Sequence, residues 1–174
     1  MKAMKKVLVS ALAAALVVTA AAPAGAATSP VKAPKAINGK ATVKGVTVKT
    51  SKKGTATVTA VKSKKATVKV AATIKVKGVT YKVTAIGANA FKNCKKVKKI
   101  SVGKNVKTIG KNAFKGCKKL KTITLANKKV TIKKGAFAGL NTKKITIKAS
   151  KMSKKALKKF KKALKKAGFK GKVK

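Results

Sequence analysis

The chain has 174 residues and carries 48 basic side chains, all lysines, with no acidic residue and no histidine. Without carboxylates or imidazoles it lacks the usual groups for acid–base catalysis and for activating a nucleophile. It also lacks the residue clusters that hold zinc or calcium. We therefore expect a non-enzymatic protein that uses no metal and no cofactor.

The net charge of +48 bears on whether the chain folds at all. High net charge favours intrinsic disorder, and it makes a compact state repel itself. Against disorder, 45% of the residues are hydrophobic, and they follow regular patterns. We expect residues 39–174 to fold around an apolar core, with bound anions as a second source of stabilisation.

The N-terminus has the three parts of a secretory signal peptide. Lysines at positions 2, 5 and 6 precede an apolar run at residues 7–22, and Ala24-Gly25-Ala26 gives a small-x-small cleavage pattern. This order predicts a signal peptide over residues 1–26. The alternative is an uncleaved anchor, but a spanning helix needs roughly 20 apolar residues.

All three prolines lie early, at positions 23, 30 and 34. Residues 27–38 are therefore predicted to form a flexible linker. With the signal peptide, this predicts a secreted, extracellular protein, and association with the cell wall is the narrower form of that prediction.

Residues 39–80 alternate apolar side chains with Lys and Thr, as in Val46-Thr47-Val48 and Val68-Lys69-Val70. This period of two predicts half-buried antiparallel strands. Turns are expected at Ser51–Gly54 and Lys62–Lys65. We interpret the region as a structural cap on the C-terminal half of the chain, with an independent binding domain as the alternative.

A 23-residue repeat occupies residues 81–149. Ala-Phe recurs at Ala90-Phe91, Ala113-Phe114 and Ala136-Phe137. Such a period predicts a short leucine-rich-repeat solenoid whose units bury their apolar edges only by stacking. Strands are expected at residues 99–102, 122–125 and 144–147, with one residue deleted in the third unit, so that Ile145 corresponds to Ile123.

The repeat also predicts the core. Phe91, Phe114 and Phe137 should stack as a column on one wall. The inward residues of the strands on the other wall are Ile100, Val102, Ile123, Leu125, Ile145 and Ile147.

The first two units, Ile86 to Cys94 and Ile109 to Cys117, resemble the I-G-x-x-A-F-x-x-C signature of BspA-like leucine-rich-repeat proteins. The third unit departs from it, because Lys133 replaces Gly and Leu140 replaces Cys. The resemblance implies a secreted or surface-attached bacterial protein, and some such proteins are adhesins. It also implies that the two cysteines are core thiols.

Cys94 and Cys117 nevertheless leave two alternatives open. An extracellular compartment and an even count permit a disulfide, and stacking would bring the two residues near bonding distance. The other hypothesis is a pair of buried thiols that pack as small apolar groups.

Residues 150–174 are predicted to form an amphipathic helix over 152–168, followed by a short strand. The apolar positions Ala156, Phe160 and Ala163 fall on one stripe, with Ser153 as the N-cap and Gly168 as the end. The helix is interpreted as a second cap. The alternative is a cationic membrane-active or antimicrobial helix.

The overall prediction is a β-rich α+β fold with a Lys-rich concave strand face that binds a partner. The residues expected on that face are Lys99, Ser101, Thr122, Thr124, Lys144, Thr146 and Lys148. Anionic cell-wall polymers, glycans or surface proteins are the expected partners. Non-specific nucleic acid binding in vitro, peripheral membrane contact and a monomeric state are also expected.

Overall fold

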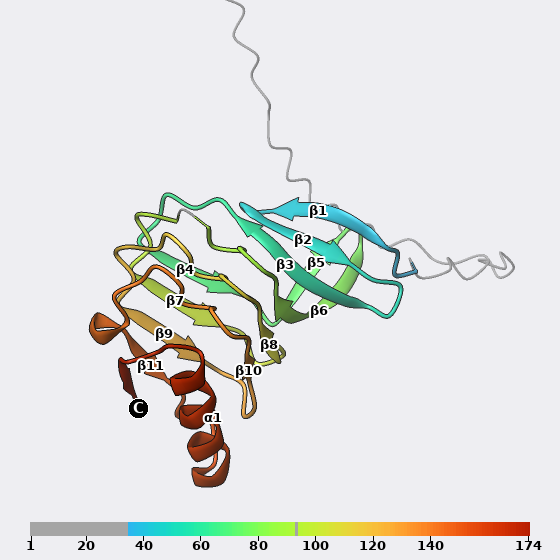
Figure 1. The fold of residues 1–174 in the computed structure, drawn as a ribbon. Coiled ribbons are helices and arrows are strands. Elements are labelled where there is room, and N and C mark those ends of the chain that lie inside the picture. Colours follow the sequence, from blue (N-terminus) through green and yellow to red (C-terminus); the bar gives the residue numbers. More distant parts are fainter. Residues whose placement is uncertain (1–34, 93) are drawn as a thin grey trace, which may run out of the picture. The chain divides into compact units, whose positions relative to one another are not determined.

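The computed structural model describes residues 35–92 and 94–174 (Figure 1). The predicted signal peptide and most of the predicted linker lie outside these residues. The strands of the first half are β1 (Gly39–Val43), β2 (Val46–Thr50), β3 (Thr55–Val61), β4 (Thr67–Val70), β5 (Thr73–Val76) and β6 (Val79–Ile86). The second half contains β7 (Lys99–Val102), β8 (Thr108–Ile109), β9 (Thr122–Leu125), β10 (Thr131–Ile132), the 3-10 helix η1 (Thr142–Lys144), β11 (Thr146–Lys148), α1 (Lys154–Lys166) and β12 (Lys172–Val173).

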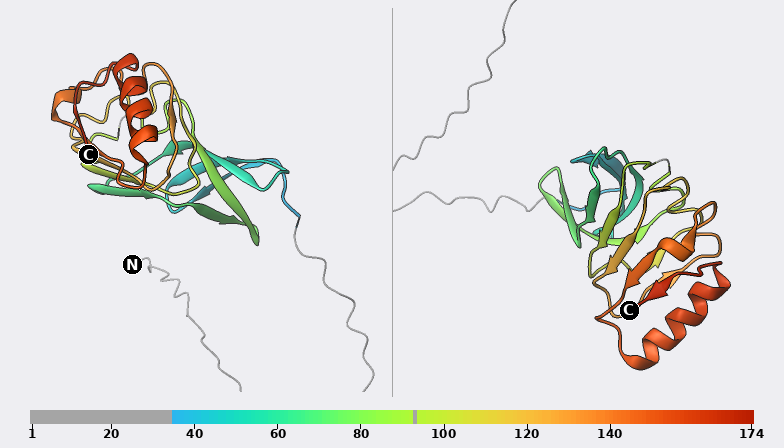
Figure 2. Two further views of the ribbon diagram at one scale, coloured as in Figure 1. Left: turned by 90° about the horizontal axis from the view of Figure 1, so that it is seen from below. Right: turned by 90° about the vertical axis from the view of Figure 1, so that its left-hand side faces the viewer.

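The chain passes repeatedly between two sheets. The five-stranded sheet has the order β12-β11-β9-β7-β4, and every pairing in it is parallel. The seven-stranded sheet has the order β1-β2-β3-β6-β8-β10, with β5 paired to β6. Because β6, β8 and β10 also pair in parallel, successive turns of the chain stack on one another (Figures 1 and 2).

The alternating N-terminal region joins both sheets. β1, β2 and β3 form an antiparallel meander, and β5 pairs antiparallel with β6, as the alternation predicted. The prediction was wrong for β4, which pairs in parallel with β7 and so forms the first strand of the five-stranded sheet. It was also wrong for the second pairing of β3, which is parallel to β6. The β5–β6 hairpin accounts for the long interval of 32 residues between the paired residues Val68 and Ile100.

The strands predicted at residues 99–102 and 122–125 are confirmed as β7 and β9. The third strand was predicted two residues too early. Ile147, rather than Ile145, pairs with Ile123, so the third unit is one residue longer than the repeat instead of one shorter. η1 takes up the additional residue, and its last turn closes with the Ile145 N–H donating to the Thr142 carbonyl oxygen. Both isoleucines are buried all the same.

Phenylalanine rings from successive units stack in the core. Phe91 and Phe114 lie 5.4 Å apart between ring centroids, and Phe114 and Phe137 are also 5.4 Å apart, which confirms the predicted column. A fourth ring extends it, because Phe169 lies 5.0 Å from Phe137. Offset and tilted arrangements at such distances are favourable for aromatic pairs.

A left-handed backbone residue precedes each Ala-Phe pair of the repeat. Asn89 and Asn112 have φ values of 57° and 54°, and Gly135 takes the same place in the third unit with φ 73°. Asn and Gly are the residues that adopt this conformation at least cost. The local sequence therefore sets the turn that delivers each phenylalanine to the core.

The last turn of the chain contains α1. The Ser153 side chain accepts a hydrogen bond from the Ala156 N–H at 3.3 Å, which confirms the predicted N-cap. After the helix, Phe169 enters the core and β12 pairs with β11. A side chain at Gly171 would collide with the carbonyl oxygens of Thr142 and Ile145, so the return to the sheet requires glycine there.

The end of the predicted linker is fixed to the fold. Tyr81, which is fully buried, accepts a hydrogen bond from the Ile37 N–H at 2.9 Å. The Thr50 hydroxyl donates to the Ile37 carbonyl oxygen, and the Asn38 side chain accepts from the Lys52 N–H. These contacts attach residues 37 and 38 to β2, β6 and the turn after β2.

Candidate binding face

The face of the five-stranded sheet that points away from the core carries two rows of polar side chains. The strand registers align the first row as Thr67, Lys99, Thr122, Thr146 and Lys172. They align the second row as Lys69, Ser101, Thr124 and Lys148. We call these nine residues the Lys–Thr face.

The Lys–Thr face has hydroxyls at its centre and ammonium groups around them. The central residues Ser101, Thr122, Thr124 and Thr146 are half-buried, whereas the four lysines are exposed. Parallel strands and the strand rise place neighbouring positions about 4.8 Å apart across the sheet and about 6.6 Å apart along it. The result is a regular lattice of donors that carries positive charge and no carboxylate.

Six of the seven residues predicted for the binding face belong to the Lys–Thr face. Lys144 does not, because it lies in η1 and not on β11. It instead lines a hollow of about 620 Å³ at the corner where the chain enters the sheet. The other residues of that hollow are Lys98, Lys118, Lys119, Leu120 and Lys121.

Sequence reasoning missed three members of the face: Thr67, Lys69 and Lys172. The signal for β4 was present, since Val68 and Val70 alternate with polar residues as Ile100 and Val102 do. The sequence separation between β4 and β7 does not fit the 23-residue period. The alternation of β4 was therefore assigned to the antiparallel region. The sequence predicted a short strand after the helix, but nothing in its two residues, Lys172 and Val173, indicated that it pairs with β11.

Cys94 and Cys117 are both buried free thiols in this structure. Cys94 donates to the Val61 carbonyl oxygen and Cys117 to the Phe91 carbonyl oxygen, each at 3.2 Å. Contact with the Cys117 side chain lowers the pKa of Cys94 to about 7. The same contact, together with burial, raises the pKa of Cys117. The sulfurs thus lie side by side in successive units, and the disulfide stays a prediction.

The apolar stripe of α1 is directed into the fold. Phe160 and Leu164 are buried, with 4% and 1% of their surface exposed, while the lysines between them face solvent. Figure 2 shows α1 lying alongside the last strands. Within the described parts of the chain, no helix is long and apolar enough to cross a bilayer.

Stacked parallel strands that recur every 23 or 24 residues, with a phenylalanine column behind them, define a leucine-rich-repeat protein. Residues 79–174 match the family model described as BspA type Leucine rich repeat region (6 copies). Since the match covers more than half of the chain, the protein belongs to the BspA-type leucine-rich-repeat family.

The chain is also similar to solved structures. A leucine rich cell surface protein from Faecalibacterium prausnitzii A2-165 is 25% identical, with a TM-score of 0.52 over 63% of this chain and 32% of the other. The chain therefore spans about a third of that protein's length. A leucine-rich repeat protein from Bacteroides capillosus ATCC 29799 is also 25% identical, with a TM-score of 0.44 over 63% of this chain and 70% of the other. No curated protein matches the chain.

Proposed function

We propose that this protein is a secreted or envelope-associated adhesion module that binds an anionic cell-wall polymer through the Lys–Thr face. Family membership supports an interaction or adhesion role, and the related Faecalibacterium protein is described as a cell surface protein. The observation that carries the proposal is the register of the sheet, which aligns hydroxyls and lysines into two parallel rows.

The chemistry of the face favours a repeating anion over a compact one. Lysine ammonium groups act as point charges for phosphate and carboxylate, and the central hydroxyls both donate and accept hydrogen bonds. Because the lysines and hydroxyls of the Lys–Thr face are regularly spaced, they can contact several regularly spaced anionic groups of one polymer at the same time. Phosphodiester wall polymers such as teichoic acid have that character, and acidic glycans are the second such class.

The fold gives the face its rigidity. We propose that the stacked units form a short solenoid, closed at one end by β1, β2 and β3 and at the other by α1. In support, the meander pairs with the first turn through β3 and β6, and α1 packs its buried stripe near β10. Terminal elements of this kind are required because the last unit of a stack cannot bury its own apolar edge.

The test compares two variants with the same loss of charge. In the face variant, Lys69, Lys99, Lys148 and Lys172 become Gln. In the control, the exposed turn and loop lysines Lys52, Lys53, Lys64 and Lys65 become Gln. Both are assayed for binding to cell-wall fractions with and without teichoic acid across a salt series.

We expect the face variant to lose about tenfold or more in affinity for teichoic-acid-bearing wall and to show a shallower salt dependence, because fewer counterions are released. The control should stay near the unchanged protein. Equal losses in both variants would mean that net charge alone governs binding, and the proposal would then be wrong. A Thr122→Val, Thr124→Val double variant tests whether the hydroxyls contribute at constant charge.

A further inference from the structure

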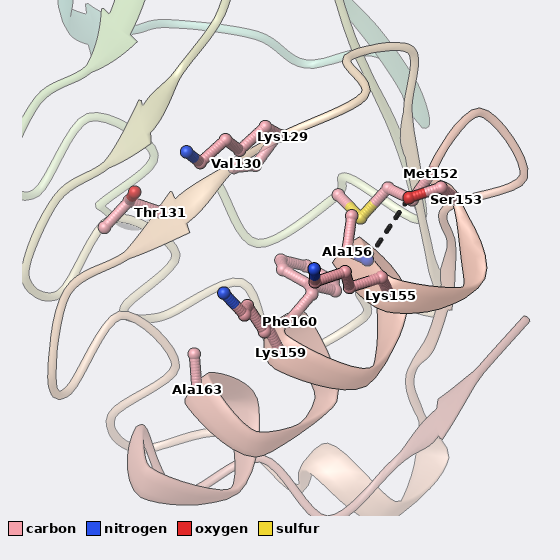
Figure 3. A pocket seen from close by; sticks show the side chains of 10 residues that line it. All are labelled: Lys129, Val130, Thr131, Met152, Ser153, Lys155, Ala156, Lys159, Phe160 and Ala163. Atoms are coloured by element: carbon pink, nitrogen blue, oxygen red, sulfur yellow. Dashed lines mark hydrogen bonds between the residues drawn. The ribbon is translucent and has the colours of Figure 1, made fainter.

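A groove lies between α1 and the segment that leads into β10, and none of its lining residues belongs to the Lys–Thr face (Figure 3). Its volume is about 380 Å³, which falls within the range of small-molecule sites. It is lined by Lys129, Val130, Thr131, Met152, Ser153, Lys155, Ala156, Lys159, Phe160 and Ala163.

The floor of the groove is an apolar strip. Val130, Met152 and Phe160 are buried, with 7%, 9% and 4% of their surface exposed. Ala156, Phe160 and Ala163 follow one another along a single side of α1, and the helical rise makes that strip about 10 Å long. The strip is linear, with a small alanine side chain at each end of the helical part.

The rim of the groove is cationic. Lys129 comes from the loop before β10, and Lys155 and Lys159 come from successive turns of α1, so their side chains stand around the floor (Figure 3). The chain contains no carboxylate side chain to neutralise them. The Ser153 hydroxyl is already engaged as the helix cap.

We propose that this groove binds one medium-chain carboxylate, with the alkyl chain along the floor and the head group among Lys129, Lys155 and Lys159. A linear apolar strip with positive charge at its edge is complementary to a molecule with a linear apolar chain and one anionic end. A flat bilayer surface does not fit, because the floor side chains Val130, Met152 and Phe160 are buried. The inference is independent of the adhesive function proposed for the sheet.

The test is isothermal titration of the 174-residue chain with octanoate, decanoate and dodecanoate below their micelle concentrations, in about 0.15 M salt to screen non-specific charge effects. Acetate supplies the head group without the chain, and dodecyl maltoside supplies the chain without the charge. We expect one carboxylate per protein, with affinity levelling off between octanoate and dodecanoate, because an extended chain of about eight carbons already spans the strip of about 10 Å.

Three variants locate the binding. Ala163→Phe fills the floor at constant charge and should weaken dodecanoate binding about tenfold or more, as overfilling a site does. Lys129, Lys155 and Lys159 changed together to Gln should give a similar loss. The matched control changes Lys158, Lys162 and Lys166 of the same helix, which do not line the groove, and should stay within about threefold of the unchanged protein.

The proposal is overturned if acetate binds as well as dodecanoate, if both lysine variants lose affinity equally, or if filling the floor leaves dodecanoate binding intact. Binding of anionic vesicles that Ala163→Phe does not weaken, without binding of free dodecanoate, would assign the helix to a membrane surface and likewise overturn it. Should Ala163→Phe lose its melting transition, Ala163→Leu makes the same test with a smaller side chain.

Discussion

The three periodic units and the C-terminal segment provide the same contacts from different sequences. In the units, the column residues are 23 positions apart, and the turn before each is set by Asn89, Asn112 or Gly135. In the C-terminal segment, α1 separates Phe137 from Phe169 by 32 positions, yet the two rings lie 5.0 Å apart. β12 likewise extends the five-stranded sheet.

This difference shows that position in the stack, and not the period, decides which contacts are made. The third unit would otherwise expose the free edge of β11 and one face of the Phe137 ring. A free strand edge favours pairing with another strand, and an exposed apolar surface favours being covered by another segment. The C-terminal segment covers both, although it shares only a phenylalanine and an alternating strand with the repeat.

The largest expected effect tests the phenylalanine column. Phe114 is fully buried with a ring on each side, so Phe114→Ala should lower the free energy of unfolding by about 3–5 kcal/mol. Phe169 has one ring neighbour in the column, and Phe169→Ala should cost about 3 kcal/mol, the low end of that range. Urea denaturation at fixed salt measures both. An unchanged transition for Phe114→Ala would contradict the core assignment.

A second prediction tests how the C-terminal segment returns to the sheet. Gly171→Ala places a methyl group against two carbonyl oxygens and should cost about 1–3 kcal/mol. Hydrogen exchange should accelerate at Lys172 and Lys174, whose N–H groups donate to Ile145 and Ile147. Lys170→Ala, at an exposed neighbour, is the control. Unchanged exchange in Gly171→Ala would show that β12 tolerates the crowding.

A third prediction concerns the start of α1. Ser153→Ala removes the side-chain acceptor for the Ala156 N–H and should cost about 1 kcal/mol. Ser150→Ala, at an exposed position three residues earlier, should change stability by less than about 0.5 kcal/mol. Thermal unfolding of the two variants under identical conditions separates them. Equal effects would mean that the cap contributes nothing to the segment.

The smallest effect tests whether the units are equivalent. Asn112→Gly copies the third unit into the second and should leave stability within about 0.5 kcal/mol, because both residues tolerate positive φ. Asn112→Ala, which tolerates it poorly, should cost about 1 kcal/mol. Denaturant titration of the pair gives the answer. A large loss for Asn112→Gly would show that the asparagine side chain has a further role.

The sequence predicted best where the pattern was local and repeated. β7, β9, the phenylalanine column and the Ser153 cap follow from spacing and residue type alone. The sequence predicted the pairing of a strand less well where more than one neighbouring strand was compatible with its pattern. The alternation in β4 fits an antiparallel or a parallel neighbour equally, since side chains alternate in both.

The Lys–Thr face shows the same limit. Ser101, Thr122 and Thr124 were placed correctly because their strands lie inside the periodic region. Lys144 was misplaced because one additional residue in the third unit was read as one residue fewer. A shift of two positions leaves the inward and outward alternation intact, so Ile145 and Ile147 are buried under either register and the sequence pattern does not distinguish them.

By itself, therefore, the sequence determined the class of fold, the phenylalanine column, the central hydroxyls of the Lys–Thr face and the start of α1, because each depends on residues within one unit or at a fixed spacing. Tertiary structure alone decided the two ends of the five-stranded sheet, the place of Phe169 in the column and the groove beside α1. These features depend on backbone hydrogen bonds and packing by segments that do not follow the 23-residue repeat. Each such segment pairs with the strand edge, or packs on the ring, that the neighbouring unit leaves uncovered.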